Sequence, residues 1–167
     1  MFTKDPGSVV AKAHGVERSP LWDKVRKAHL AQEPSCVACK KKRKGLWAKV
    51  VALVRPVQVH HIYPFQLVTK LGRPDLELDL RNLITLCASG DNHHELLGHL
   101  ADFQSFCINI RQLAISSFFG MKRPDILAST VWKALHEKRP KDVDKMTDQE
   151  RATYRAELDV VFPKPTV

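Results

Sequence analysis

The sequence predicts a small α+β domain flanked by helices at both ends, and three observations support this. The chain has 167 residues, enough for one domain with a modest core. Two short segments, 57–62 and 82–87, have the β-branched, apolar character of strands. Helix signals precede and follow them. Hydrophobic residues make up 44% of the chain and charged residues 27%, which is ordinary for a globular protein.

The N-terminal part divides into an arm and a helix. Residues 1–17 contain Gly, Pro, Ser and mixed charge, and we expect a flexible arm. Ser19 and Pro20 then form a helix start, with Ser at the N-cap and Pro at the first helical position. Pro34 ends this helix. Its expected apolar face consists of Leu21, Val25 and Ala28.

The central part contains the expected strands. The Val-rich run 46–54 reads as a strand that forms a hairpin-like unit with 57–62, although its periodicity also fits a short helix. Residues 65–80 read as a loop, and residues 88–92 form a turn cluster.

Helices dominate the remainder. We expect a long amphipathic helix from His94 to Ser117 and another between Pro124 and Pro140. A last helix starts at Thr147, because Thr147 and Glu150 fit a capping box. The predicted division is therefore a flexible arm (1–17), a domain (18–120) and a C-terminal helical extension (121–167).

Positive charge is concentrated near the N-terminus. Residues 18–55 hold all of the formal net charge of +9, with Asp23 and Glu33 as their only acids. Such a patch favours a polyanionic partner, because each neutralised phosphate releases counterions. The alternative is a solvated lysine-rich loop. The candidate phosphate contacts are Lys24, Lys27, Lys40, Lys41, Lys42, Arg43 and Lys44.

The cysteines suggest a metal site. Cys36 and Cys39 form a C-x2-C pair, and Cys87 and His93 follow at a distance that suits a structural zinc site. Cys107 lies in an apolar stretch and is expected to be a buried small side chain. The N-terminus lacks the apolar core of a signal peptide, and no apolar run is long enough to span a membrane. We therefore expect a reducing, cytoplasmic setting without disulfides or membrane partners.

Five of the eight histidines lie at positions 60, 61, 93, 94 and 99. Histidine is suited both to metal ligation and to proton transfer near neutral pH. A single histidine would be assigned to packing or to the surface, but this grouping favours a functional site.

These motifs resemble the HNH endonucleases. The resemblance rests on Val59 to Phe65, Asp79 to Cys87, His93-His94 and Gly98-His99, and covers roughly residues 18–105. It implies a ββα-metal core, two strands and a helix around one divalent ion, in the zinc-containing variant common in bacteriophages and bacteria. The implied setting is the cytoplasm of a bacterium or a phage-infected cell.

The resemblance also implies roles for individual residues. His61 would be the general base, and Asn82 would orient the loop or the base by hydrogen bonding. His60, which needs a local distortion to serve the same site as His61, would be a ligand of the catalytic metal. The other two implied ligands are His94 and His99. The ion stays open among Mg²⁺, Mn²⁺, Ni²⁺, Co²⁺ and Zn²⁺.

Two details of the metal sites stay open in the sequence. Relatives often carry a second C-x2-C pair where this chain continues after Cys87 with Ala-Ser-Gly. His93 is therefore the preferred fourth zinc ligand, with His99 or water as alternatives. His94 and His99 are five residues apart, which rotates them by about 140° on an ideal helix. Either His94 lies in an unwound first turn, or the helix bulges.

The expected function is metal-dependent hydrolysis of phosphodiester bonds in DNA, by nicking or double-strand cleavage, with RNA as a further partner. The alternative is a zinc-stabilised nucleic-acid-binding module without catalysis. The basic helix and the zinc site fit both hypotheses, whereas His61 with Asn82 favours the enzyme. Monomer and homodimer both remain open.

Overall fold

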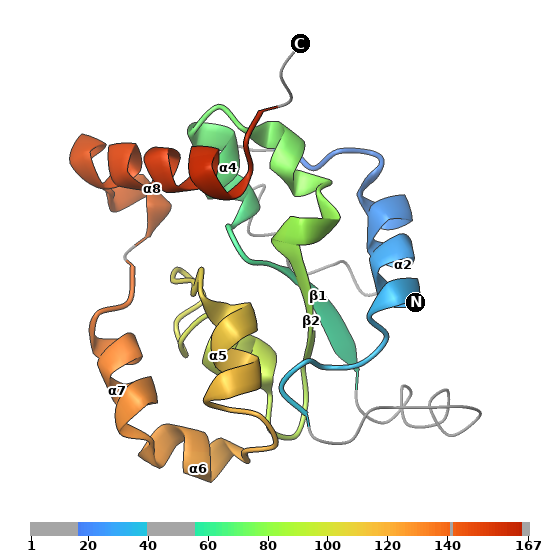
Figure 1. The fold of residues 1–167 in the computed structure, drawn as a ribbon, viewed down its shortest axis with the longest axis vertical. Helices are drawn as coiled ribbons and strands as arrows, with labels where there is room; N and C mark the ends of the chain where they lie inside the picture. Colours follow the sequence, from blue (N-terminus) through green and yellow to red (C-terminus); the bar gives the residue numbers. More distant parts are fainter. Residues whose placement is uncertain (1–16, 40–55, 141, 165–167) are drawn as a thin grey trace.

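A computed structural model describes residues 17–39, 56–140 and 142–164. Three predicted features lie outside these ranges: the arm apart from Glu17, the strand expected at 46–54, and the basic run from Lys40 to Lys44. Within the described part, the chain forms a mixed helical and stranded fold, as the sequence predicts (Figure 1).

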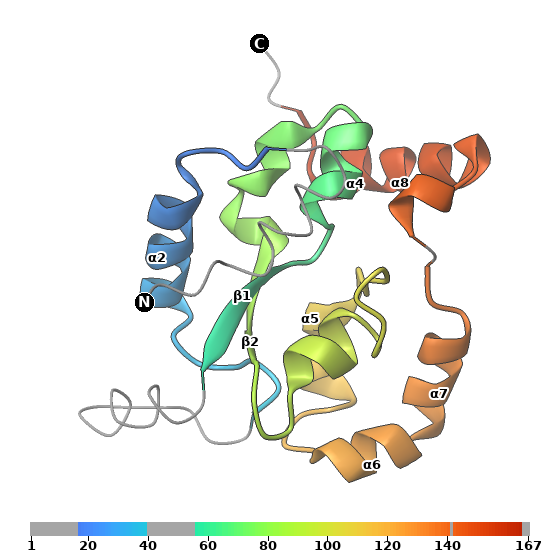
Figure 2. The ribbon, with the colours of Figure 1, turned by 180° about the vertical axis from the view of Figure 1, so that it is seen from behind.

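The centre of the fold is a two-stranded antiparallel sheet. Strands β1 (Val57–His61) and β2 (Leu83–Cys87) confirm the two strands predicted there. Their register places His60 opposite Ile84 and His61 opposite Leu83. All five residues of β2 are buried, because helix α2 lies on one side of the sheet and the elements after β2 lie on the other (Figures 1 and 2).

Helix α2 (Trp22–Gln32) confirms the predicted N-terminal helix but not its buried face. Leu21 is 53% exposed and Ala28 is also exposed, whereas Trp22 and His29 are buried. The prediction was wrong because it ranked positions by aliphatic character, whereas the large ring of Trp22 removes more surface from water. The predicted helix start was also wrong: Leu21, not Ser19, is the N-cap, and Ser19 accepts a hydrogen bond from the Leu21 N–H in the turn before the helix.

Glu33 fastens α2 to the sheet. Its carboxylate accepts hydrogen bonds from the Thr85 N–H at 2.6 Å and from Arg111 at 2.7 Å. Burial opposes ionisation of Glu33, but hydrogen bonds from His29, Arg111 and Thr85 outweigh it and lower its pKa to about 2. The turn that follows α2, which carries the first cysteines, is therefore anchored to the edge of β2.

The segment predicted as a loop between residues 65 and 80 is largely helical. It contains α4 (Phe65–Lys70) and the 3-10 turn η1 (Pro74–Glu77). A second 3-10 turn, η2 (Leu80–Asn82), leads into β2. Phe65, Leu67 and Val68 are buried in the core, and this tertiary burial stabilises a helix too short for its periodicity to be recognised.

The long helix predicted from His94 to Ser117 is also wrong. One π-helical turn, η3 (His94–Gly98), is followed by a loop and then by α5 (Ile110–Ser116). Leu100 and Ala101 adopt left-handed backbone angles, with φ of 50° and 60°, which an α-helix cannot contain. The chain therefore reverses directly after His99.

Three helices form the C-terminal part. The single helix expected after Pro124 is divided into α6 (Arg123–Ala128) and α7 (Thr130–Glu137), because Ser129 is extended and caps α7. Helix α8 (Asp148–Val161) starts with the predicted capping box. Buried residues of these helices belong to the same core cluster as β2. In the described part of the chain, no helix is long and apolar enough to cross a membrane.

Candidate metal sites

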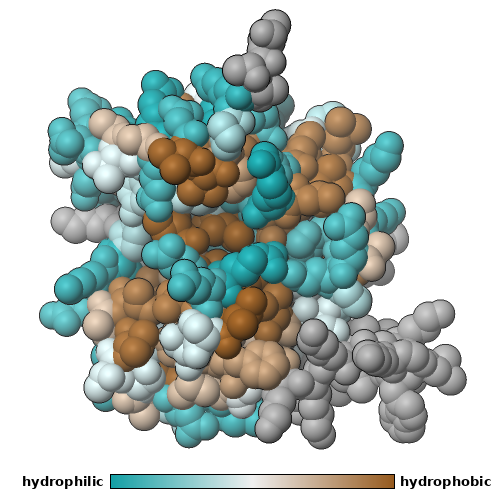
Figure 3. Space-filling view, in the orientation of Figure 1, coloured by the Kyte–Doolittle hydropathy of each residue, from teal (hydrophilic) through white to brown (hydrophobic). Residues whose placement is uncertain are grey.

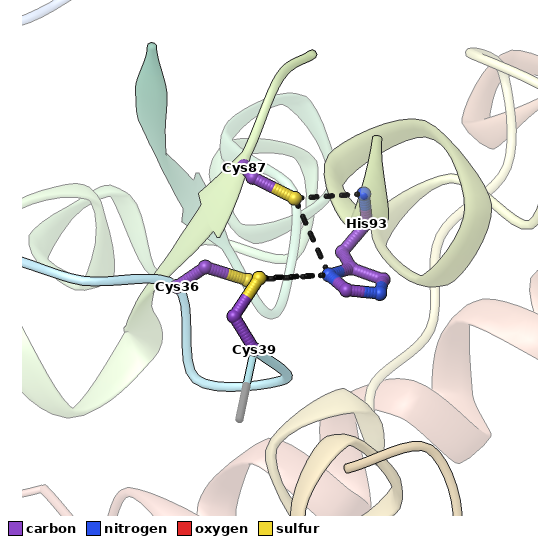
Figure 4. A group of neighbouring side chains, drawn as sticks. All are labelled: Cys36, Cys39, Cys87 and His93. Atoms are coloured by element: carbon purple, nitrogen blue, oxygen red, sulfur yellow. Dashed lines mark hydrogen bonds between the residues drawn. The ribbon is translucent and has the colours of Figure 1, made fainter. Parts of the chain in front are cut away.

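Four predicted zinc ligands come together at one end of the sheet, and we call them the zinc group: Cys36, Cys39, Cys87 and His93. Their side chains converge from three segments (Figure 4). The Nδ1 atom of His93 lies 3.3 Å from the sulfur of Cys87, 3.4 Å from that of Cys36 and 3.6 Å from that of Cys39. Tetrahedral zinc with ordinary bond lengths separates such nitrogen and sulfur atoms by about 3.6 Å. The group therefore has the donor set and spacing of a structural zinc site.

The surroundings of the zinc group favour ligation. His93 donates from Nε2 to the carbonyl of Met121 at 3.3 Å, which fixes the ring and leaves Nδ1 facing the sulfurs. Burial disfavours a charged His93, but hydrogen bonds with Cys39 and Cys87 raise its pKa to about 10. Hydrogen bonds from Cys36 and Cys39 hold the pKa of Cys87 well below its usual range. The pocket therefore stabilises one thiolate, on Cys87, while hydrogen bonds with Cys39 and Cys87 and burial raise the pKa of the Cys36 thiol.

Cys107 stands apart from the zinc group. It is 7% exposed in the core, and burial raises the pKa of its thiol to about 11. The prediction that it is a small buried side chain is confirmed.

A second set of histidines lies between the sheet and η3, and we call it the histidine group: His60, His94 and His99. One ring nitrogen of each lies within 4.8 Å of the others. The ring centroids are 4.8–5.1 Å apart and the ring planes are nearly perpendicular, at 79–84°. Three imidazoles that turn their edges toward one point form a set that can hold a divalent ion.

The π-helical turn resolves the five-residue spacing between His94 and His99. One of the two expected solutions was a bulge in the helix, and η3 is such a bulge. A π turn repeats from residue i to i+5 rather than i+4, so it returns His99 to the side of the turn that carries His94. The N–H of Ala101 bonds to the carbonyl of Glu95 at 2.9 Å and closes the turn.

Protonation and hydrogen bonding suit the histidine group for metal ligation. Burial, together with the neighbouring histidines, holds the pKa of His60 well below its usual value. Burial also lowers the pKa of His99. The Nδ1 of His99 donates to the carbonyl of Ser105 at 3.1 Å, which leaves Nε2 as the lone-pair atom. The Nε2 of His60 is buried and has no hydrogen-bond partner in the described part. An unpaired buried nitrogen costs free energy, and ligation of a metal ion would remove that cost.

Gly98 leaves room for the His60 ring in the histidine group, because it has no side chain. A Cβ atom at position 98 would lie 3.1–3.2 Å from three atoms of the His60 ring, closer than ordinary contact allows. The last residue of η3 is therefore packed directly on the imidazole. The motif Gly98-His99 was recognised in the sequence, but the packing of Gly98 on the His60 ring was not predicted.

We expect the Gly98→Ala variant to bind a divalent ion at the histidine group about tenfold more weakly, because the methyl group must displace the His60 ring by a few tenths of an ångström. Isothermal titration of zinc-loaded protein with Mn²⁺ or Ni²⁺ measures the change. The variant Gly90→Ala is the contrast, because φ at Gly90 is 67° but no atom lies within 4 Å of a Cβ built there: it should lower stability through backbone strain and leave the affinity for the ion unchanged. Unchanged affinity in Gly98→Ala would contradict the packing argument.

His61 occupies the opposite side of β1. Its ring stacks on Trp22, with centroids 4.6 Å apart, and its Nε2 lies 3.0 Å from the backbone carbonyl of Glu77. The structure therefore does not place His61 among the donor atoms of the histidine group. A ring that donates from Nε2 carries its lone pair on Nδ1.

Asn82 fixes the loop after β1 rather than either group of histidines. It is fully buried, accepts from the N–H of Tyr63 at 2.8 Å and donates to the carbonyls of Tyr63 and Leu76. The Leu76 carbonyl is adjacent to Glu77, whose own carbonyl accepts from His61. Asn82 therefore helps to position the backbone that holds His61.

Helix α2 carries two of the predicted phosphate contacts and a tryptophan that was not singled out in the sequence. Lys24 and Lys27 are both exposed on α2. Trp22 was not recognised as part of the site, although its ring covers His61. The guanidinium of Arg18 lies over the Trp22 ring, 4.5 Å from its centroid.

These groups define a small α+β protein with two clusters that can hold metal ions, one of cysteines and histidine and one of histidines alone. No family model, curated protein or solved structure matches the chain. The argument for function therefore rests on the chemistry of these residues.

Proposed function

We propose that this protein is a metal-dependent nuclease with a ββα-metal core of the HNH type, which hydrolyses phosphodiester bonds in DNA. The main support is the histidine group, in which three imidazoles converge and the buried Nε2 of His60 has no hydrogen-bond partner in the described part. A fully buried imidazole of this kind is an expensive arrangement unless it binds something.

In this proposal the histidine group holds the catalytic ion. A divalent ion held there would act as a Lewis acid toward the phosphate and the departing 3′-oxygen. His60 and His61 are the last two residues of β1. They point to opposite sides of β1, so a phosphodiester would have to pass over this end of the strand to reach both the histidine group and His61.

His61 is the proposed general base. Donation from Nε2 to the Glu77 carbonyl fixes the ring, and the imidazole would take a proton from the attacking water. Asn82 acts as a positioning residue through the loop that contains Glu77. The stack of Trp22 on the imidazole limits the ring to one orientation.

The zinc group would keep this arrangement in place and present the basic helix. It joins the turn after α2 to the end of β2 and the start of η3. Lys24 and Lys27 would contact phosphates without sequence preference. A binding module without catalysis would need the same zinc group and lysines, but it would not need the histidine group.

The test is a supercoiled-plasmid assay on zinc-loaded protein with Mg²⁺, Mn²⁺, Ni²⁺, Co²⁺ or Zn²⁺ added in turn. We expect nicked or linear product only when one of these ions is present, and none from the His60→Ala variant, which loses a ligand. EDTA should stop the reaction. Binding of the plasmid without cleavage under every ion would support the binding module instead.

A further inference from the structure

One exposed aromatic side chain lies beside the histidine group. The large exposed apolar residues in the described part are Leu21, Phe103, Ile115, Phe119, Val131, Val160 and Val161. Apolar side chains reach the surface at several separate places on the face shown in Figure 3. Of these seven residues, Phe103 has its ring against the histidines, with its centroid 4.8 Å from that of His99 and 6.5 Å from that of His94.

The loop that carries Phe103 is held in place. The N–H of Asp102 bonds to the carbonyl of His99 at 2.9 Å, and the Asp102 carboxylate accepts from the Gln104 N–H and from Arg139. Leu100 and Ala101 keep left-handed backbone angles, which non-glycine residues rarely adopt. The surrounding bonds therefore impose the turn that brings Phe103 back to His99.

Exposure of this ring is not explained by packing. Phe103 is 58% exposed although it is a large apolar side chain next to the partly buried histidine group. One part of the ring contacts His99, and the remainder faces solvent where a substrate held at the histidine group would pass. An aromatic ring in such a position can stack on a nucleobase, because every base has a π face.

We propose that Phe103 is a stacking platform for one nucleobase that flanks the scissile phosphate, and that the protein therefore acts best where that base is unpaired. This inference rests on the proposed nuclease function. Stacking of this kind contributes about 1–3 kcal/mol per base and tolerates any sequence. Phe103 holds the strand beside the histidine group and takes no part in ligation or proton transfer.

The first experiment compares cleavage of oligonucleotides by Phe103→Ala, Phe103→Trp and the wild type. We expect Phe103→Ala to reduce kcat/KM by roughly 5- to 150-fold on a single-stranded substrate. Phe103→Trp should restore cleavage. Phe119→Ala, which removes another exposed phenylalanine (46% exposed), is the matched control and should cleave like the wild type.

The second experiment removes the base instead of the ring. An abasic site beside the cleaved bond should slow the wild type by the same factor as Phe103→Ala and should have no further effect on that variant. If the abasic site slowed Phe103→Ala by as large a factor as it slows the wild type, the two changes would act independently, and the stacking proposal would be overturned. Weaker binding of Mn²⁺ to Phe103→Ala would also overturn it, since the ring would then act by shielding the ion.

A binding measurement separates this inference from the proposed function. In zinc-loaded protein with no second ion added, 2-aminopurine placed at the flanking position should change its fluorescence on binding the wild type but not Phe103→Ala. Wild-type cleavage with no difference in either assay would refute the platform and leave the nuclease intact. A fluorescence difference without cleavage under any ion would refute the nuclease and leave the platform.

Discussion

Replacing Cys87 by serine is expected to abolish tight zinc binding and to unfold much of the protein at ordinary temperature. Cys87 ends β2, while its partners follow α2 and precede η3, so zinc would tie together three segments. A two-stranded sheet is barely stable by itself. Structural zinc contributes apparent binding free energies of about 10–16 kcal/mol in small domains at neutral pH. Elemental analysis and thermal unfolding followed by circular dichroism measure the two effects.

Cys107→Ala is the matched control for this prediction. Cys107 is as buried as the cysteine ligands but lies outside the zinc group. The control should retain about one zinc ion per chain and lose only the packing of one sulfur atom, on the order of 1–2 kcal/mol. A Cys87→Ser protein with an unchanged melting temperature would show that zinc has no structural role.

Zinc loss should also disturb the histidine group. His93 belongs to the zinc group and His94, the next residue, belongs to the histidine group. Both lie where η3 begins, so any movement of His93 carries His94 with it. The two candidate metal sites are therefore neighbours in the chain, so we expect the order of metal loading to matter in any assay.

Local patterns were sufficient to predict several elements. The β-branched runs 57–62 and 82–87 form the strands, and the spacing of Thr147 and Glu150 gives the observed capping box. The C-x2-C pair, Cys87 and His93 were grouped correctly because cysteine and histidine have few other reasons to recur at such spacing. In each case the residue types and their spacing were sufficient for the prediction.

Other features depend on tertiary contacts that a sequence pattern does not contain. Trp22 and His29, rather than the aliphatic residues, form the buried face of α2 because they meet β1 and Glu33. The periodicity from 94 to 117 fits a helix, yet the left-handed angles at Leu100 and Ala101 divide it. The role of Gly98 became visible only when the His60 ring was placed against it.

His61→Ala is expected to reduce DNA cleavage by about 10²- to 10⁴-fold while leaving metal binding unchanged. A loss of this size is what removal of a general base typically causes. Metal binding should persist because His61 lies outside the histidine group, on the α2 side of β1. Single-turnover cleavage with saturating ion, together with titration of Mn²⁺, measures the two quantities separately.

His61→Gln distinguishes a chemical role from a structural one. The glutamine amide can still donate to the Glu77 carbonyl and pack against Trp22, but it cannot take a proton from water. If His61 is the base, both variants should be equally slow, although only the alanine variant leaves the carbonyl without its donor. Substantial cleavage by His61→Gln would instead assign His61 to the support of the loop. The contrast with His60→Ala completes the argument, since that variant should lose the ion and cleavage together.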